Sequence, residues 1–301
     1  MRYLREDRIA IIDNGIKKDL ICKEKIQSQI VIDDNNMCIE DKDEILITDF
    51  QHGTICALIV KRYNSDCILN SVRILDKNGK GGIEKIEPAL EWCYQNNIKV
   101  VNLSFGTTNF KDYEKLKKIV NKYVYKGMII VAATANSGFV SYPASFTNVI
   151  GVATTGSPLS YSEDYMQMGI DTVVPSEHIV KMLDKEVKTS LSNSYAAPYV
   201  CALIANRLNT DKTLSIKKLK EYAKEQSHIE MIGGIYEPDW AYKAYVADGK
   251  KSSKANYYFE AVSGVFNKIR DEVDTVIAFS MADLKELNIE NKNLIYLGRE
   301  D

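Results

Sequence analysis

The sequence predicts an α/β fold with a mostly parallel central sheet and helices on both of its faces. Short apolar runs alternate with helical segments from residue 8 to residue 226. The apolar runs are nearly continuous, as in RIAIID (8–13) and MIIVAA (128–133), and do not alternate between apolar and polar residues. Continuous apolar strands are typical of parallel sheets, because crossover helices bury both faces of such sheets.

The expected elements follow each other in a regular order. Strands are predicted at 8–13, 67–75, 99–105, 128–133 and 148–154, and helices at 52–63, 82–97, 112–126 and about 215–226. The helix at 112–126 has the clearest pattern, because Leu116, Val120 and Tyr123 share one face and Gly127 ends it. The acidic segment 32–44 offers carboxylates to a calcium ion, but a solvated loop fits better because no EF-hand spacing appears.

The chain is predicted to contain one large domain and a smaller extension. Residues 1–230 hold the repeated strand and helix pattern, and GGIYEPDW (233–240) is typical of a linker or turn. The extension, 231–301, is expected to contain a helix at about 257–270, a strand at 274–280, a short helix and a strand at 293–298. We find no internal repeat and no low-complexity tract.

Composition and charge exclude several classes of protein. The 301 residues carry a net charge of −2, which gives no electrostatic case for nucleic acid or an anionic membrane. No apolar run approaches the roughly 20 residues needed to cross a bilayer. The N-terminus has no apolar segment typical of a secretion signal, and the six cysteines form no CxxC pair. We therefore expect reduced thiols, no metal or other cofactor, and a cytoplasmic location.

Two motifs place an acid and a base at the ends of predicted elements. In IAIIDNG (9–15), Asp13 ends a buried strand, where parallel sheets hold their functional groups, and Gly15 allows a turn. In QHGT (51–54), His52 opens a helix and Gly53 allows close backbone approach. Each motif has an alternative explanation, because turn aspartates and structural histidines are common. The other histidines, His178 and His228, lie in polar contexts and are expected to be solvated or structural.

Two further motifs suggest a nucleophile and a stabilised anion. In SNSYAAPYV (192–200), Ser194 precedes a helix with few charges. Backbone N–H groups at a helix start are unpaired and can hold a developing oxyanion. The alternative is that Ser194 is an ordinary helix cap. In VAATANSG (131–138), Asn136 follows a strand, so its amide can donate to the same oxyanion as the Ser194 N–H, or it can be a turn residue.

Together these motifs carry a resemblance to a known family. IIDNG, HGT, VNLSFG (101–106), VAATANSG, YPAS (142–145) with VIGVAT after it, DTVVP (171–175) and SNSYAAPYV occur in the order found in the subtilases, the subtilisin-like serine proteases. The chain thus resembles a subtilase over about residues 8–226. The resemblance implies a serine endopeptidase in which Asp13, His52 and Ser194 form a triad and Asn136 helps the Ser194 N–H to hold the oxyanion.

The resemblance also implies a peptide or protein substrate that binds as an extended strand. Its unprimed side would lie between Gly79–Gly82 and Ser104–Gly106, and its P1 side chain between Ala133–Gly138 and Ser141–Tyr142. The candidate substrate-binding residues are therefore Gly79, Gly81, Gly82, Ser104, Phe105, Gly106, Ala133, Ser137, Gly138, Ser141 and Tyr142.

The sequence departs from the family pattern near the nucleophile. The usual Gly-Thr-Ser is Ser192-Asn193-Ser194, and Tyr199 stands where histidine is common. These changes, and a first strand that begins near residue 8, suggest an intracellular member of restricted specificity, such as one that removes leader peptides from ribosomal peptides. The alternatives are a pseudoprotease that binds a peptide without cutting it, and a transpeptidase or macrocyclase. Cys56 shares a helix face with His52, as in proteinase K-like members, although a buried hydrophobic role is favoured.

Overall fold

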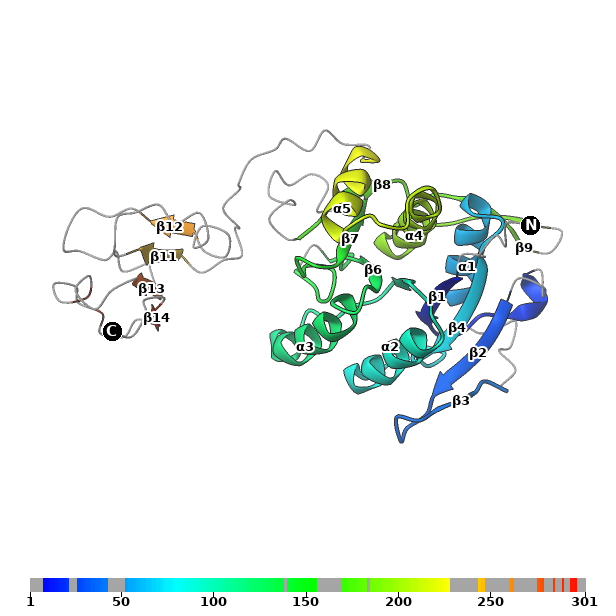
Figure 1. Cartoon of the computed structure of the whole chain (residues 1–301), viewed down its shortest axis with the longest axis horizontal. Coiled ribbons are helices and arrows are strands. Elements are labelled where there is room, and N and C mark those ends of the chain that lie inside the picture. The colour runs from blue at the N-terminus through cyan, green and yellow to red at the C-terminus, as the bar shows by residue number, and fades with distance from the viewer. Residues whose placement is uncertain are drawn as a thin grey trace. The chain divides into compact units, whose positions relative to one another are not determined.

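The computed structural model describes residues 8–21, 26–42, 52–137, 140–155, 169–182 and 185–227, and short strand segments further on (Figure 1). The chain divides into two compact units. The first comprises Met1–Ser162 and Gly169–Met231, and the second comprises Glu163–Met168 and Ile232–Asp301. No helix in the described part of the chain is long and apolar enough to cross a membrane.

A mixed but mainly parallel sheet forms the centre of the first unit. Its strand order is β3-β2-β4-β1-β5-β6-β7-β8, and every pairing is parallel except that of β2 with β3. The strands are β1 (Arg8–Asp13), β2 (Ile26–Ile32), β3 (Cys38–Glu40), β4 (Ile68–Arg73), β5 (Val100–Leu103), β6 (Ile129–Ala133), β7 (Ile150–Thr154) and β8 (Thr172–Val174). The predicted α/β class with a mostly parallel sheet is confirmed.

Helices cover both faces of this sheet. They are α1 (His52–Tyr63), α2 (Ile86–Gln95), α3 (Tyr113–Val124), α4 (Asn193–Thr210) and α5 (Ile216–Glu225), with 3-10 turns at Lys18–Leu20, Ile83–Lys85 and Phe110–Asp112. The central strand β1 shows why its run of apolar residues is continuous. Ile9 and Ile11 belong to the core that includes α1, α4 and α5, whereas Ala10 and Ile12 belong to the core that includes α2 and α3.

The topology brings the predicted site residues to one edge of the sheet. Strands β1 and β5 are neighbours, and the chain continues from them toward opposite sides of the sheet. Crevices at such reversals of strand order are the usual location of sites in α/β sheets. Asp13 lies at the carboxyl end of β1, and Ser104 directly follows β5.

The structure corrects parts of the sequence interpretation. The segment 32–44 is not only a loop, because β3 pairs with β2 there. Its acids also have protein partners: Asp33 accepts backbone hydrogen bonds from Asn35 and Met37, and Asp41 forms a two-pronged ion pair with Arg73. The hairpin of β9 (Ile179–Met182) and β10 (Lys185–Lys188) was not anticipated, because its strands are short and mostly exposed.

The described part of the second unit is a parallel sheet with strand order β12-β11-β13-β14. Its strands are β11 (Lys243–Val246), β12 (Glu260–Val262), β13 (Thr275–Ala278) and β14 (Asn293–Tyr296). The helix expected over 257–270 is wrong at residues 260–262, which pair with β11 as a strand. The remainder of that expected helix lies outside the described residues.

Candidate active site

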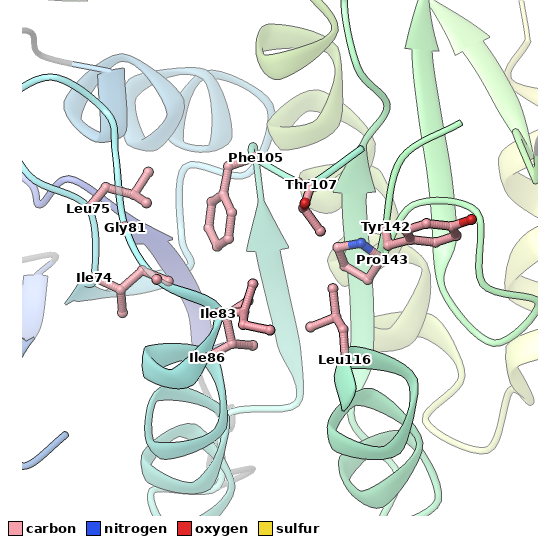
Figure 2. A pocket seen from close by; sticks show the side chains of 12 residues that line it. Ile74, Leu75, Gly81, Ile83, Ile86, Phe105, Thr107, Leu116, Tyr142 and Pro143 are labelled. Atoms are coloured by element: carbon pink, nitrogen blue, oxygen red, sulfur yellow. The ribbon is translucent and has the colours of Figure 1, made fainter. Parts of the chain in front are cut away.

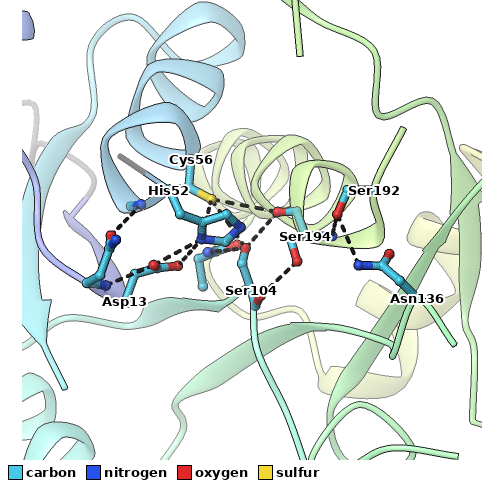
Figure 3. Close-up of polar contacts among 10 residues, drawn as sticks. Asp13, His52, Cys56, Ser104, Asn136, Ser192 and Ser194 are labelled. Carbon is cyan, nitrogen blue, oxygen red and sulfur yellow. Dashed lines mark hydrogen bonds and ion pairs between the residues drawn. The ribbon is translucent and has the colours of Figure 1, made fainter. Parts of the chain in front are cut away.

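The acid and the base predicted from the sequence form a buried pair. Asp13 is 0% exposed, and its two carboxylate oxygens lie 3.0 and 2.9 Å from Nδ1 of His52 (Figure 3). The backbone N–H of Asn14 donates to Asp13 Oδ1 at 2.8 Å. The carboxylate is thereby fixed against the imidazole, and Nδ1 must carry the proton that lies between them. The remaining ring nitrogen, Nε2, is then able to accept a proton.

Gly53 allows α1 to begin close to the end of β1. A Cβ atom at this position would lie 2.5 Å from the main-chain oxygen of Gly15 and 3.0 Å from Cβ of Asp13. The Gly53 N–H donates to Oδ1 of Asn14 at 2.9 Å, which ties the first turn of the helix to the strand. Gly15 has a φ of 98°, as its predicted turn requires. The close approach expected at Gly53 is confirmed.

The surroundings of His52 raise the pKa of its imidazole above the ordinary value. Burial acts to lower this pKa, but the electrostatic interactions and hydrogen bonds with Cys56 and Asp13 outweigh it. The ring packs with its centroid 5.3 Å from that of Tyr195, the residue after Ser194. A proton on His52 is therefore held more strongly than on a free imidazole.

Ser194 lies in the first turn of α4 and is joined to the end of β5 by two hydrogen bonds. Its hydroxyl donates to the main-chain oxygen of Ser104 at 3.0 Å, and the Ser104 hydroxyl donates to the main-chain oxygen of Ser194 at 2.8 Å. Asn102 donates in turn to the Ser104 hydroxyl at 2.9 Å. Ser104, expected only to bind substrate, thus also fixes the start of α4.

The two predicted oxyanion donors point at the same atom. Asn136 Nδ2 and the backbone N–H of Ser194 donate to Oγ of Ser192, at 3.2 and 3.3 Å. Oδ1 of Asn136 accepts the backbone N–H of Asn193 at 2.8 Å. Because a backbone N–H can only donate, this contact fixes which end of the Asn136 amide faces Ser192. The two donors therefore converge on the hydroxyl oxygen of Ser192.

Asn193 is a supporting residue whose role the sequence did not reveal. Its side chain is 0% exposed, and Oδ1 accepts the backbone N–H of Thr154 at 2.8 Å. Nδ2 lies within hydrogen-bonding distance of Thr134 Oγ1 and of the main-chain oxygens of Thr134 and Ala135. This amide ties the start of α4 to the ends of β6 and β7. The only sequence signal was the departure from the family's usual threonine.

The motifs and the fold have a counterpart among known families. The model of the Subtilase family, Peptidase_S8, matches residues 6–254 of this chain. The chain belongs to the subtilase family.

Curated subtilases and a solved structure are similar to this subtilase over part of their length. The minor extracellular protease Epr of Bacillus subtilis is 27% identical over 58% of this chain and 29% of its own length. Subtilisin BL and subtilisin Savinase of Lederbergia lenta are each 32% identical over 46% of this chain and 52% of their own length. The chain thus spans about half, or less, of the relatives it matches. A cold-adapted subtilisin-like serine proteinase shares the fold, with a TM-score of 0.56 and 20% identity over 72% of this chain and 81% of its own.

A pocket opens beside the end of β5 (Figure 2). Five of the predicted substrate-binding residues line it: Gly81, Gly82, Phe105, Gly106 and Tyr142. Apolar side chains of Ile74, Leu75, Ile83, Ile86 and Leu116 complete most of its wall. A Cβ atom at Gly106 would lie 2.7 Å from the main-chain oxygen of Tyr142, so glycine is required where these segments meet.

The other predicted substrate-binding residues do not line this pocket. Gly79, with a φ of 74°, forms the turn from Asp76 to Lys80, and Ala133 is buried at the end of β6. Ser141 is buried and accepts the backbone N–H of Ala135, so its hydroxyl supports the loop that carries Asn136. Ser137 is exposed, and Gly138 lies outside the described residues.

The buried thiol of Cys56 lies close to the catalytic candidates (Figure 3). Its sulfur is buried and lies 3.9 Å from His52 Nδ1, 3.5 Å from the Ser104 hydroxyl and 3.7 Å from the main-chain oxygen of Ser194. Asp13, His52 and Cys56 are the one group among the described residues whose potential metal ligands lie together, within 4.8 Å. A metal ion there would compete with the pairing of His52 and Asp13, because both use Nδ1.

Proposed function

We propose that this subtilase is a serine endopeptidase with Asp13, His52 and Ser194 as its catalytic residues. The observation that carries the proposal is the buried contact of Asp13 with His52 Nδ1, at 2.9 Å, beside the helix start that holds Ser194. A buried carboxylate that orients an imidazole near a hydroxyl is the arrangement needed for nucleophilic attack on a carbonyl.

In the proposed reaction, Nε2 of His52 removes the proton of the Ser194 hydroxyl as Oγ attacks the scissile carbonyl carbon. The hydroxyl must first turn from the main-chain oxygen of Ser104, which accepts it at 3.0 Å, toward the imidazole. Asp13 stabilises the imidazolium that results. His52 then protonates the leaving amine, and a water molecule activated by His52 releases the acyl group from Ser194.

The developing negative charge would be held by two donors that are already oriented. The Ser194 N–H lies at the positive end of α4, and Asn136 is fixed by the Asn193 N–H. Such preorganised donors stabilise a tetrahedral oxyanion without reorganising as the charge forms.

We infer that the substrate is a peptide segment that carries an apolar side chain upstream of the cleaved bond. The pocket beside Phe105 and Gly106 is lined mainly by aliphatic and aromatic residues. Restricted cleavage inside the cytoplasm, such as removal of a leader peptide, is the physiological role we propose. Of the described cysteines, Cys38, Cys56, Cys93 and Cys201 form no disulfide, which suits a reducing compartment.

Labelling with a fluorophosphonate tests the proposed activity. The probe should modify Ser194 in the wild-type protein and fail to modify the Ser194→Ala and His52→Ala variants. Ser190, an exposed serine four residues earlier, provides the control, because Ser190→Ala should label like the wild type. Peptide mapping by mass spectrometry locates the modified residue. Wild-type protein that is folded but unlabelled would instead support a peptide-binding pseudoprotease.

A second measurement separates hydrolysis from ring closure. A transpeptidase or macrocyclase would use the same acyl-enzyme and pass the acyl group to an amine. Mass spectrometry of the products from a peptide library distinguishes the two, since hydrolysis adds one water to the substrate mass and cyclisation does not.

A further inference from the structure

The side chain of Ser192 occupies the position that both oxyanion donors address. Asn136 Nδ2 lies 3.2 Å from its Oγ, and the Ser194 backbone nitrogen lies 3.3 Å from the same atom (Figure 3). A substrate oxyanion would have to sit about 3 Å from both donors. The Ser192 oxygen therefore stands close to where that oxyanion would form.

The donors are fixed more firmly than the oxygen they contact. Asn136 is held by the Asn193 N–H at 2.8 Å, and Asn193 is itself buried and hydrogen-bonded through both ends of its amide. The Ser194 N–H belongs to the first turn of α4. Both contacts to Ser192 Oγ are longer than the contact that fixes Asn136. The Ser192 side chain is thus the part of this arrangement that is easiest to move.

The backbone of Ser192 allows its side chain to leave. Its φ of −162° and ψ of 135° are extended values that any residue adopts, and its N–H is held by Ser176 Oγ at 3.1 Å. Rotation about the Cα–Cβ bond is therefore enough to remove the hydroxyl from between the donors. No movement of α4 or of the loop that carries Asn136 is needed.

The Ser194 N–H has two competing uses at this position. Ser192 is the N-cap of α4, and its oxygen satisfies one of the backbone donors that a helix start leaves unpaired. The same donor is needed by the substrate. A residue without a side-chain oxygen at position 192 would leave the donor to water, which exchanges readily.

We infer that the Ser192 hydroxyl is a resident occupant of the oxyanion hole, which the substrate carbonyl must displace before Ser194 can react. This inference rests on the proposed function, because it assigns the two donors to an oxyanion. Ser192 is thus a positioning residue that lowers the rate at which Ser194 reacts. Substrates that bind tightly enough to displace its hydroxyl are favoured.

The variants Ser192→Gly and Ser192→Ala test the inference. Both remove the occupying oxygen, so the second-order rate of fluorophosphonate labelling at Ser194 should rise by about three- to tenfold, the range expected from releasing a helix-cap contact. Glycine is itself an accepted N-cap residue, so Ser192→Gly should fold normally. The rise should appear in the rate with this small probe, whose phosphoryl oxygen must enter the same hole.

Ser215 provides a matched control. It is the N-cap of α5, where its hydroxyl oxygen accepts the backbone N–H of Lys218, and neither residue belongs to the site. Ser215→Gly should lower thermal stability slightly and leave the labelling rate unchanged. If Ser192→Gly and Ser215→Gly are both labelled faster than the wild type, loosening of a helix is responsible, and the assignment to Ser192 is overturned.

The outcomes also separate this inference from the proposed function. If wild-type protein is labelled and both Ser192 variants are labelled at the same rate or more slowly, the hydroxyl is not an obstacle and the inference is wrong, while the protease assignment stands. If neither wild type nor Ser192→Gly is labelled at Ser194, the proposed function fails and takes the inference with it. Labelling that appears only in Ser192→Gly supports both.

Discussion

Two buried histidines of this subtilase have opposite electrostatic surroundings. His52 is 9% exposed and faces the carboxylate of Asp13, which helps to raise its pKa. His178 is 3% exposed, and burial, followed by the positive charge of Arg62, lowers its pKa to about 4 although its hydrogen bonds oppose the shift. One imidazole is prepared to accept a proton, whereas the other is held neutral.

The partners of His178 explain the difference. Its Nε2 lies 3.2 Å from the main-chain oxygen of Tyr195, so that nitrogen carries the proton, and Nδ1 then accepts the hydroxyl of Tyr63 at 3.0 Å. Tyr199, which replaces the histidine common at this family position, packs against the ring. His178 is thus buried and not solvated. A carboxylate that faces a buried histidine raises its pKa and makes it a candidate base.

Replacing the Asp13 carboxylate that faces His52 should give the largest effect on activity. Asp13→Asn should lower kcat about 10⁴-fold, because the amide neither stabilises the imidazolium nor fixes the proton on Nδ1. Activity requires neutral His52, so kcat/KM of the wild type should rise with pH through the raised pKa of His52. In Asp13→Asn this rise of kcat/KM with pH, the acid limb of the profile, should occur at lower pH. Rates on a cleaved library peptide, measured across pH, provide both quantities.

Asp171 is a suitable control for that change. It is also a poorly exposed acid, but it pairs with Lys220 at 3.0 Å and accepts the Gly151 N–H, away from the site. Asp171→Asn should reduce stability and leave the acid limb of the rate profile in place. An acid limb that moves equally in both variants would show that Asp13 does not set the pKa of His52.

The second test concerns how the two histidines affect folding. Because the pKa of His178 is lowered, its contribution to stability is complete above the unfolded value near 6.5 and is lost as pH falls toward about 4. His178→Gln keeps a hydrogen-bonding side chain but cannot titrate. The variant should be less stable at pH 7, by about 1–3 kcal/mol, and should lose less of its stability between pH 6.5 and 4.

Urea unfolding at several pH values measures this dependence, preferably in the Ser194→Ala background to prevent self-cleavage. His52 should act in the opposite direction, because a raised pKa contributes stability that disappears as pH increases. If His178→Gln and its parent lose stability in parallel below pH 6.5, then His178 is not the group that titrates.

The contrast between the two histidines also marks what the sequence could predict. Asp13 and His52 stand at element ends within short motifs, so local pattern and parallel topology are enough to bring them to one edge of the sheet. The burial of His178 depends on Tyr63, 115 positions away in the chain, and on α4. Polar neighbours in the sequence gave no indication of these contacts.

The difference between contacts within a motif and contacts between distant residues also applies to the strands and to the candidate oxyanion donors. β1 and β6 were predicted almost to the residue because both of their faces are buried, whereas β9 and β10 are short and mostly exposed. Asn136 was found because it follows a strand. The contact of Ser192 with Asn136 could not be found, because it depends on the rotation of two side chains.

The smallest expected effect on activity comes from the thiol beside His52. Cys56→Ala should change kcat/KM by less than about tenfold, because the sulfur makes only weak hydrogen bonds. However, a mercurial bound to this sulfur would lie against His52 Nδ1, at 3.9 Å, and against the start of α4. We expect p-mercuribenzoate to inactivate the wild type slowly, since Cys56 is buried, and to spare Cys56→Ala.

Cys38 makes this experiment specific. Cys38 is exposed and should react first. It lies on β3, the edge strand of the sheet, which contributes no residue to the proposed mechanism. Cys38→Ala should therefore remain sensitive to the mercurial. In the wild type, residual activity followed against thiol modification should show a fast silent step at Cys38 and a slow inactivating step at Cys56. Inactivation that persists unchanged in Cys56→Ala would assign it to a different thiol, and the sulfur beside His52 would then be only a packing residue, like its buried counterpart Cys93 on α2.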